Sequence, residues 1–244
     1  MDLSNKIILV VGGATGIGSA TARICAAAGA QVIVADYNER AGAETAAAAN
    51  AMFAPVNVMD EDSVKTLFKR VAERYGHLDV LIQTAGVLRG AYVPVEEFTL
   101  ATFQNVVDIN ATGSFLCSKY AVPLIRKAGG GAIILISSIA ASNVSSSVAY
   151  GTSKGSVSSL GVTLANKLAA DHIRVNVVHP GGIKTAMKLS VIGAEAELHG
   201  QSGEEAMAQA AAGDELGEPE GVGRILAWLA SDDADYVRGF LFTR

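Results

Sequence analysis

The stretch KIILVVGGATGIGSA, at positions 6–20, decides the fold class of this chain. Its apolar run at 6–11 predicts a buried β-strand, which leads into Gly12, Gly16 and Gly18 and then into a helical pattern. Glycine allows a tight turn and a close approach of backbone N–H groups to phosphate, and the helix start adds the positive end of its dipole. The stretch therefore predicts a strand–turn–helix unit that binds a phosphate. The alternative is a plain tight turn.

The same alternation continues along the chain. Apolar runs recur at 31–35, 51–58, 79–83, 132–136, 173–179 and 239–243, with helical patterns at 17–28, 39–50, 61–75, 99–128, 150–171 and 220–230. Near-continuous apolar strands separated by helices are typical of a parallel sheet covered on both faces. We predict a single α/β domain over residues 1–244, a doubly wound parallel sheet of about seven strands with helices on both faces. The acidic, glycine-broken segment 188–220 predicts a substrate lid at 187–216.

The composition limits the classes of molecule that this chain is expected to bind. The chain has 244 residues, of which 50% are hydrophobic and 18% are charged, and its net charge is −5, which disfavours nucleic acid and anionic membranes. Cys25 and Cys117 lie in apolar helical segments, so we expect buried thiols in a reducing, cytoplasmic compartment. The four histidines are scattered, and we expect no metal. A small molecule is the expected partner.

Asp36 ends the second predicted strand. A carboxylate there can accept both ribose hydroxyls of an adenosine and would repel a 2′-phosphate. At about 4 Å and an effective dielectric near 20, one charge pair is worth roughly 4 kcal/mol, which favours NAD over NADP. Two observations weigh against this interpretation: Asp36 could instead cap the helix beginning near Glu39, and the nearby Arg40 would favour a phosphate.

Tyr150 and Lys154 are the strongest catalytic candidates. Residues four apart share one face of a helix, so the two side chains project together. An ammonium about 4 Å from a phenol favours the phenolate by roughly 4 kcal/mol, or about 3 pKa units, which would bring the phenol close to neutrality. General acid/base catalysis works best in that range. The alternative is a packed tyrosine beside a solvated lysine.

Further polar positions follow strands or interrupt helices. Ser137 and Ser138 end the strand at 132–136, where open α/β sheets bind ligands, and successive residues of a strand point to opposite faces. Asn110 lies inside the helical pattern 99–128, where the neutral interpretation is a surface side chain. The segment HPGGIKT, at 179–185, predicts another sharp turn at the same sheet edge.

Taken together and in order, GGATGIG, Asp36, Asn110, ISS, YGTSK and PGGIKT resemble the short-chain dehydrogenase/reductase family, from Ile7 to about Phe242. The resemblance implies a Rossmann-type sheet and an NAD-dependent oxidoreductase that interconverts a secondary alcohol and a ketone. It implies that Tyr150 is the acid/base, that Lys154 lowers its pKa and holds the nicotinamide ribose, that Ser138 positions the substrate oxygen, and that Asn110 holds a water in a proton relay. It places the cofactor against Gly12, Thr15, Gly16, Ile17, Gly18, Asp36, Tyr37, Asn57, Val58, Ala85, Gly86, Tyr150, Lys154, Pro180, Gly181, Ile183 and Thr185.

Several positions depart from the family pattern. Val11 replaces a threonine, QTAG at 83–86 replaces a pair of asparagines, and Asn57 replaces an aspartate. Ser138 lies one residue closer to Tyr150 than expected, a spacing that Ser137 would restore. The sequence ends at Arg244 before the usual Val-Asp-Gly-Gly, so either the last strand is short or the native C-terminus is not represented. The family implies a homotetramer or homodimer, with contacts at that edge.

The substrate pocket is expected near 87–93, 140–148 and the lid. These segments are mostly small and apolar, which favours a neutral alcohol or ketone, with Met187, Leu189, Val191 and Ile192 closing over it. Two other functions remain open. One is an NAD-holding relative that has lost catalysis and works through a partner, and the other is epimerisation or dehydration of a sugar nucleotide.

Overall fold

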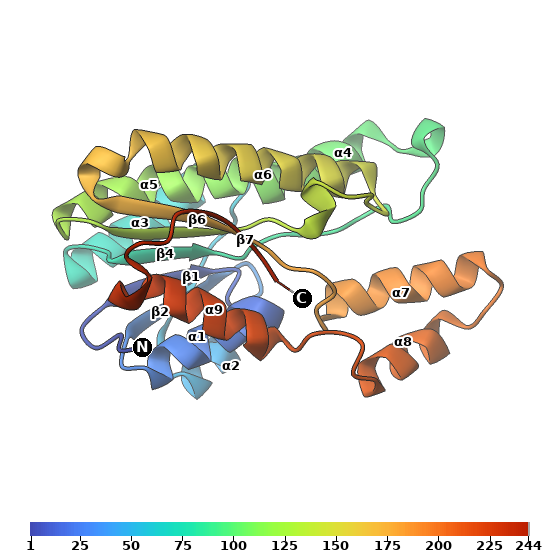
Figure 1. Ribbon diagram of the computed structural model, residues 1–244, viewed down its shortest axis with the longest axis horizontal. Helices are drawn as coiled ribbons and strands as arrows, with labels where there is room; N and C mark the ends of the chain where they lie inside the picture. Colours follow the sequence, from blue (N-terminus) through green and yellow to red (C-terminus); the bar gives the residue numbers. More distant parts are fainter. Residues whose placement is uncertain (244) are drawn as a thin grey trace.

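A computed structural model describes residues 1–243, and Arg244 lies outside the described residues. Seven strands of this part form one sheet in the order β3-β2-β1-β4-β5-β6-β7, and every neighbouring pair is parallel (Figure 1). The strands are β1 (Ile7–Val11), β2 (Gln31–Asp36), β3 (Met52–Pro55), β4 (Val80–Gln83), β5 (Gly131–Ile136), β6 (Ile173–His179) and β7 (Gly239–Phe242).

Helices cover both faces of the sheet (Figure 1). One face packs against α1 (Gly16–Ala27), α2 (Glu39–Ala48) and α9 (Pro219–Ala230), and the other against α3 (Glu61–Tyr75), α5 (Gly113–Lys127) and α6 (Val148–Lys167). The prediction of a Rossmann-type, doubly wound parallel sheet of seven strands is therefore confirmed.

The strands are buried on both sides, which explains their unbroken apolar sequences. In β1, Leu9 lies between Ile33 and Leu81 and faces the side of α3 and α5, whereas Ile8 faces the side of α1 and α9. Both side chains are fully buried. Burying each stabilises the fold by about 1.5–3 kcal/mol, so the central strands are the most strongly specified elements.

Two predicted elements differ from the observed ones. The run at 51–58 yields only the short strand β3, because Pro55 has no N–H for the ladder and Asn57 begins a turn, its Oδ1 accepting the Met59 N–H at 3.1 Å. The helical pattern at 99–128 is α4 (Leu100–Val107) and α5 joined by a π-helical turn, Asp108–Thr112. Asn110 lies in this turn, a feature that often marks a functional site.

The predicted lid segment contains two packed helices, α7 (Ala186–Leu198) and α8 (Gly203–Ala212). They project beyond the sheet in Figure 1. Their base is closed by backbone bonds from Lys184 N to Gly217 O and from Gly217 N to Gly182 O, both at 2.8 Å. The glycine-broken helix formers of this segment therefore form a helical pair anchored at both ends.

The strand order creates the place where the site forms. From β1 the chain runs outward to β2 and β3, and it then returns to β4 on the opposite side of β1. A crevice opens where the connections diverge, beyond the carboxyl ends of β1 and β4, and open α/β sheets bind ligands at such a switch point.

Candidate active site and cofactor cavity

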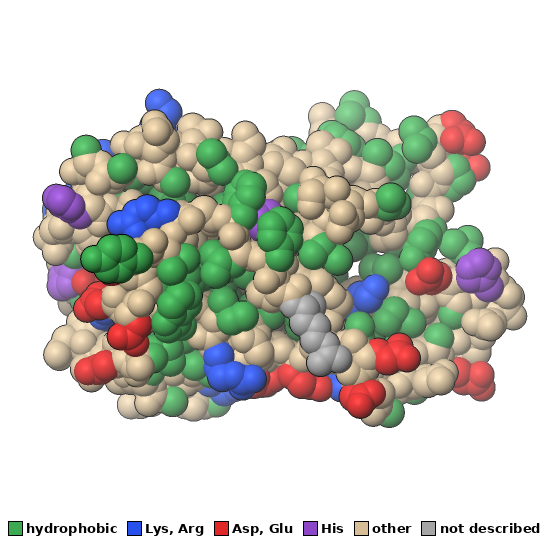
Figure 2. Space-filling view, in the orientation of Figure 1, with side chains coloured by type: hydrophobic (Ala, Val, Ile, Leu, Met, Phe, Trp, Pro, Cys, Tyr) green, Lys and Arg blue, Asp and Glu red, His purple; other side chains and the backbone are tan. Residues whose placement is uncertain are grey.

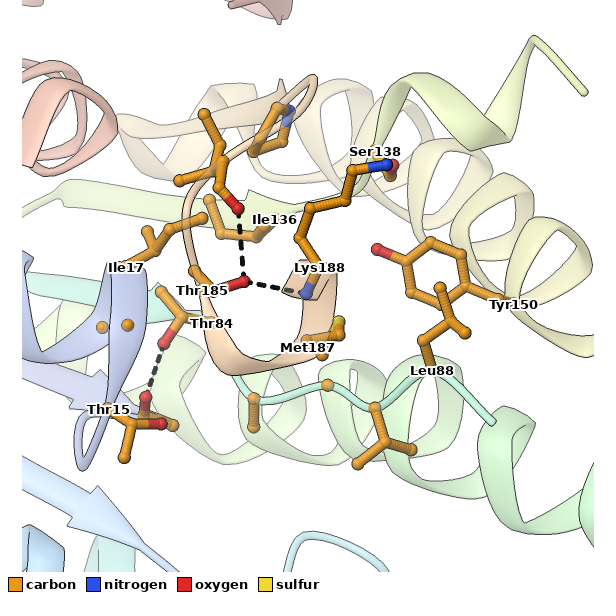
Figure 3. A pocket seen from close by; sticks show the side chains of 18 of the residues that line it. Thr15, Ile17, Thr84, Leu88, Ile136, Ser138, Tyr150, Thr185, Met187 and Lys188 are labelled. Atoms are coloured by element: carbon orange, nitrogen blue, oxygen red, sulfur yellow. Dashed lines mark hydrogen bonds between the residues drawn. The ribbon is translucent and has the colours of Figure 1, made fainter. Parts of the chain in front are cut away.

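A cavity of about 1130 Å³ lies at this switch point (Figure 3). Ser138, Tyr150 and Lys154 line it, whereas Asn110 lies behind its wall. The structure thus brings together every position predicted to contact a cofactor: Gly12, Thr15, Gly16, Ile17, Gly18, Asp36, Tyr37, Asn57, Val58, Ala85, Gly86, Tyr150, Lys154, Pro180, Gly181, Ile183 and Thr185.

The glycine turn after β1 allows close backbone approach. Gly12 has φ +80°, and a Cβ there would lie 2.3 Å from the Ala85 nitrogen. A Cβ on Gly18 would lie 2.1 Å from the Gly12 carbonyl oxygen. Both distances are impossible for a real side chain, so glycine is required for β1, β4 and α1 to converge at the cavity.

The start of α1 fits a diphosphate. Its N-cap residue, Thr15, makes no side-chain capping bond, and the first turn of α1 carries no acidic residue. The first N–H groups of a helix lack partners within it, so these groups present donors and a positive dipole end to the cavity. Thr15, Gly16 and Ile17 all line the cavity at this point.

Asp36 is held at the cavity wall by two backbone donors. Its Oδ2 accepts the Ala14 N–H at 3.0 Å and its Oδ1 accepts the Asn38 N–H at 2.9 Å. The alternative that Asp36 caps α2 is wrong, because Asn38 is the cap and accepts the Ala41 N–H. Arg40 pairs with Glu44 at 3.3 Å with its side chain 89% exposed, and it does not line the cavity.

Tyr150, Ser138 and Lys154 converge from α6 and the end of β5. The Tyr150 side chain faces Ser138, and the interaction with this serine acts to lower the Tyr150 pKa. The buried Lys154 ammonium lies 5.7 Å from the centre of the Tyr150 ring and donates to the Ile136 carbonyl at 2.8 Å. Small residues make this convergence possible, since a Cβ on Gly86 would lie 3.2 Å from the Lys154 ammonium.

The electrostatics of this pair differ from the sequence expectation. Burial raises the pKa of Tyr150, and the interaction with Ser138 only partly opposes that effect. Burial also lowers the pKa of Lys154 to about 8. The expected lowering of the Tyr150 pKa by Lys154 is therefore wrong for this structure, because both groups lose solvent and the ammonium is bound to the Ile136 carbonyl.

The two serines that follow β5 point to different sides. Ser138 faces Tyr150, and its Oγ accepts the Ala140 N–H at 3.2 Å. Ser137 Oγ instead donates to the Lys154 carbonyl at 2.8 Å and bonds with Ser158 at 2.9 Å. Ser137 therefore anchors α6 to β5, although both serines line the cavity, and Ser138 is the one that faces Tyr150.

Asn110 is fully buried, so the interpretation as a surface side chain is wrong. Its Oδ1 accepts the Val87 N–H at 2.8 Å, and its Nδ2 donates to the Val87 carbonyl and to Ser153 Oγ, each at 2.9 Å. Asn110 thus ties the loop after β4 to α6. Its Oδ1 and the Lys154 ammonium both lie next to Gly86.

Thr84, which was not singled out from the sequence, holds the segment 83–86 against the end of β1. Thr84 Oγ1 bonds to the Val11 and Gly12 carbonyls at 2.8 and 3.1 Å. Gln83 does not take this role, since both side-chain polar atoms are buried without a hydrogen-bond partner and it does not line the cavity. The threonine at the second position of QTAG is the sequence feature that could have indicated this contact.

Only some of the lid residues that were expected to close over the substrate line the cavity. Met187 and Val191 line it, whereas Leu189 and Ile192 do not. Arg89 and Lys188, which lie in the expected segments but were not singled out from the sequence, line it as well. A lone lysine on a helix usually indicates a solvated side chain, so no sequence signal singled out Lys188.

Comparison with known proteins places the chain in a family. The family model described as "Enoyl-(Acyl carrier protein) reductase" matches residues 12–242. The cis-4-hydroxycyclohexanecarboxylate dehydrogenase of Sinomonas cyclohexanicum is 37% identical, over 97% of this chain and 93% of that protein. The cyclohexanol dehydrogenase of Acinetobacter sp. (strain SE19) is 34% identical, over 97% of this chain and 92% of that protein.

The fold comparison agrees with the sequence comparison. The crystal structure of levodione reductase superposes with a TM-score of 0.89 at 27% identity, over 98% of this chain and 96% of that chain. The chain belongs to the short-chain dehydrogenase/reductase family and is an oxidoreductase of Rossmann fold.

Two kinds of feature are absent from the described residues: a membrane-spanning helix and a metal-binding cluster. Within residues 1–243, no helix is long and apolar enough to cross a membrane. In the same part of the chain, no cluster of three or more His, Cys, Asp or Glu side chains is arranged to hold a metal ion.

Proposed function

We propose that this protein is an NAD-dependent oxidoreductase that interconverts a secondary alcohol and a ketone on a ring or similar hydrocarbon body. The observation that carries the proposal is the convergence of Tyr150, Ser138 and Lys154 in one cavity with the α1 turn. Relatives named for hydroxycyclohexanecarboxylate and cyclohexanol support a cyclic substrate. Those names include both a charged and a neutral substrate, so they leave substrate charge open.

Tyr150 is the proposed acid/base. Because burial raises its pKa, the phenol keeps its proton near neutral pH and is ready to donate it to a carbonyl oxygen. In the reverse direction the deprotonated oxygen accepts the proton of the alcohol. Ser138, which lies beside Tyr150, holds the substrate oxygen in place.

Lys154 and Asn110 are proposed to act behind the tyrosine. Lys154 binds the nicotinamide ribose and is fixed by the Ile136 carbonyl. Asn110 positions the loop at Val87 and lies next to Gly86, where it would hold a water that passes protons toward Lys154. A bound nicotinamide dinucleotide supplies the hydride chemistry, and the protein supplies orientation and exclusion of water.

The cofactor proposal is NAD rather than NADP. Asp36 lines the cavity with its carboxylate fixed by two backbone N–H groups, and Arg40 points to Glu44. A 2′-phosphate would meet a carboxylate, and Arg40 is not placed to compensate. Replacing Asp36 with Ser should lower the ratio of NAD affinity to NADP affinity by about tenfold or more. The reason is that one partly desolvated charge pair is worth a few kcal/mol.

The proposal extends to assembly and location. Phe240 and Phe242 on the edge strand β7 are 46% and 61% exposed, which supports a homodimer or homotetramer that covers this edge. Figure 2 shows hydrophobic side chains gathered around it. Cys25 and Cys117 are both free and buried, which supports a reducing, cytoplasmic location.

The test is a panel of cyclic secondary alcohols and ketones, each assayed with NAD(H) and NADP(H) by nicotinamide absorbance. Tyr150→Phe removes only the acidic hydroxyl, so we expect kcat to fall by about 10²–10⁴-fold. The dissociation constant of NADH, measured by its fluorescence, should change little. Wild-type turnover in the variant would show that Tyr150 is not the acid/base. Cofactor binding without turnover of any substrate would favour the non-catalytic alternative.

A further inference from the structure

The substrate end of the cavity contains a half-buried cation without a counter-ion. Lys188, in the first turn of α7, lines the cavity, and none of the ion pairs or side-chain hydrogen bonds found in residues 1–243 involves its ammonium. Partial loss of solvent around an ammonium costs free energy unless an anion compensates. We propose that Lys188 binds a carboxylate of the substrate, so that the substrate is a hydroxy acid or oxo acid. This inference rests on the proposed function.

The position of Lys188 is set by the start of α7. Thr185 is the N-cap of this helix, and its Oγ1 accepts the Lys188 N–H at 3.3 Å. Figure 3 shows the Lys188 side chain extending from this turn toward the end of the cavity that holds Ser138 and Tyr150. The ammonium is therefore carried on a fixed backbone and directed toward the proposed site of proton transfer.

The other charges of the cavity are already paired or lie elsewhere. Arg23 pairs with Glu220 at 3.3 Å, and Lys184 pairs with Glu218 at 2.7 Å. Lys154 is bound to a backbone carbonyl. Of the carboxylates that line the cavity, Asp36 is held by backbone N–H groups at the proposed adenosine end, and Glu220 is held by Arg23.

Arg89 is another lining cation for which no ion pair is found within residues 1–243, but its exposure differs from that of Lys188. Its side chain is exposed, whereas Lys188 is half-buried. Water screens an exposed charge, so a carboxylate gains less from Arg89. Lys188 is therefore the proposed anchor, and Arg89 is a rim charge that draws anions toward the cavity.

Part of the wall around the site is apolar. Leu88, Met187, Val144 and Val191 line the cavity, and Figure 3 shows Leu88 beside Tyr150 and Met187 near Lys188. A ligand that fits this arrangement has a hydrocarbon body that carries both the reacting oxygen and an anionic group within reach of Lys188. The expectation of a neutral substrate, made from the small apolar residues of these segments, overlooked this cation.

A cofactor diphosphate is the competing partner for Lys188. Figure 3 shows its side chain running away from Thr15 and Ile17, which lie at the α1 turn. The N–H groups of α1 already supply donors at that turn. The geometry therefore favours the substrate carboxylate over the diphosphate, and measured cofactor affinity separates the two.

The first experiment compares selectivity. Wild type, Lys188→Met, Lys188→Arg and Lys184→Met are assayed with cis-4-hydroxycyclohexanecarboxylate and with cyclohexanol. We expect Lys188→Met to lower the carboxylate-to-cyclohexanol ratio of kcat/KM by about 10–100-fold, mainly through KM, because a charge-assisted hydrogen bond is lost. Lys188→Arg should keep most of the ratio. Lys184→Met removes the same charge from a paired lysine of the same cavity and should change the ratio by less than about fivefold.

The second experiment does not need turnover. Binding of cyclohexanecarboxylate to the NADH-loaded protein is measured by calorimetry, with cyclohexylmethanol as the neutral comparison. We expect Lys188→Met to weaken the carboxylate by about 10–100-fold and the alcohol far less. Failure of turnover with intact, Lys188-dependent carboxylate binding would reject the dehydrogenase activity but support this inference.

Three outcomes would overturn the inference. The first is an equal affinity of wild type and Lys188→Met for cyclohexanecarboxylate, or no binding to wild type. The second is a loss of carboxylate affinity in Arg89→Met but not in Lys188→Met. The third is a tenfold weaker NADH affinity in Lys188→Met with an unchanged carboxylate-to-cyclohexanol ratio, which would assign the ammonium to the cofactor.

Discussion

At the scale of single residues, solvent exclusion decides the chemistry of the site. Tyr150 and Lys154 share a helix face, yet their pKa values are governed by burial, which raises the first and lowers the second to about 8. Burial disfavours whichever form is charged, so a phenol keeps its proton and an ammonium loses its proton more readily. The protein alone therefore holds a protonated Tyr150 at neutral pH, which suits proton donation.

The direction of the Tyr150 shift predicts the pH dependence of turnover. Alcohol oxidation needs the deprotonated phenol, so its kcat/KM should rise with pH by up to about tenfold per unit below the pKa. Ketone reduction needs the protonated phenol and should stay nearly level between pH 6 and about 8. Initial rates in both directions over this range provide the measurement. A level oxidation profile would show that Tyr150 is already deprotonated at neutral pH.

The low pKa of Lys154 predicts a pH-dependent stability. Its pKa of about 8 lies below the ordinary value of 10.5, so between these values the unfolded chain binds more protons than the folded one. The contribution of Lys154 to the free energy of unfolding should therefore increase with pH, by roughly 2 kcal/mol from pH 8 to pH 9.5. Urea unfolding of wild type and of Lys154→Met at both pH values isolates this contribution from other groups. An equal pH response in the two proteins would mean that Lys154 titrates normally.

At the scale of elements, a side-chain contact joins the lid helix α7 to the loop after β4. The Tyr92 hydroxyl interacts with the Glu195 carboxylate of α7, and burial together with this interaction raises the pKa of Tyr92. Its backbone has φ +62°, uncommon for a residue other than glycine, and its N–H donates to the Ser146 carbonyl at 2.6 Å. The loop is thus held on both sides, and Tyr92 connects it with α7 over the cavity.

Tyr92→Phe should loosen this connection. Removing the hydroxyl deletes an interaction with a carboxylate, so α7 should open more often and KM should rise by about 3–10-fold. Hydrogen exchange of the α7 amides should accelerate, while the dissociation constant of NADH stays near wild type. Tyr236→Phe is the matched control, because Tyr236 is fully exposed. Unchanged exchange in α7 would show that the contact does not hold the lid.

At the scale of the whole molecule, the cofactor cavity is made by segments from most of the chain. Its walls come from Gly12 near one end of the sequence to Pro219 near the other, all converging on one sheet edge. A ligand bound there contacts both sides of the switch point. Its binding should therefore stabilise the fold as a unit and not one part of it.

This coupling predicts one unfolding transition that shifts as a whole. At a concentration 100 times its dissociation constant, NADH should add about 2.7 kcal/mol to the free energy of unfolding. For a chain of this size the midpoint should rise by about 5–10 °C. Calorimetry or circular dichroism with and without NADH measures the shift. Two separate transitions, only one of them moved by NADH, would contradict the prediction of a single domain.

Local patterns in the sequence were enough to predict the fold. The apolar run before Gly12 and the repeated alternation of strands and helices predict the parallel sheet, because strand and helix periods are properties of neighbouring residues. The same kind of information places Tyr150 and Lys154 on one helix face and the polar strand ends at one sheet edge. These predictions depend only on the spacing of residues along the chain, which can be read directly from the sequence.

Only the tertiary structure decided how these groups behave. It buries Asn110 in a π-helical turn and directs Lys188 to the substrate end of the cavity. It also raises the pKa of Tyr150 where spacing alone predicted a lower one. The physical reason is that solvent exclusion and ion pairing depend on which distant segments pack around a group, and the spacing of residues along the chain does not specify those neighbours.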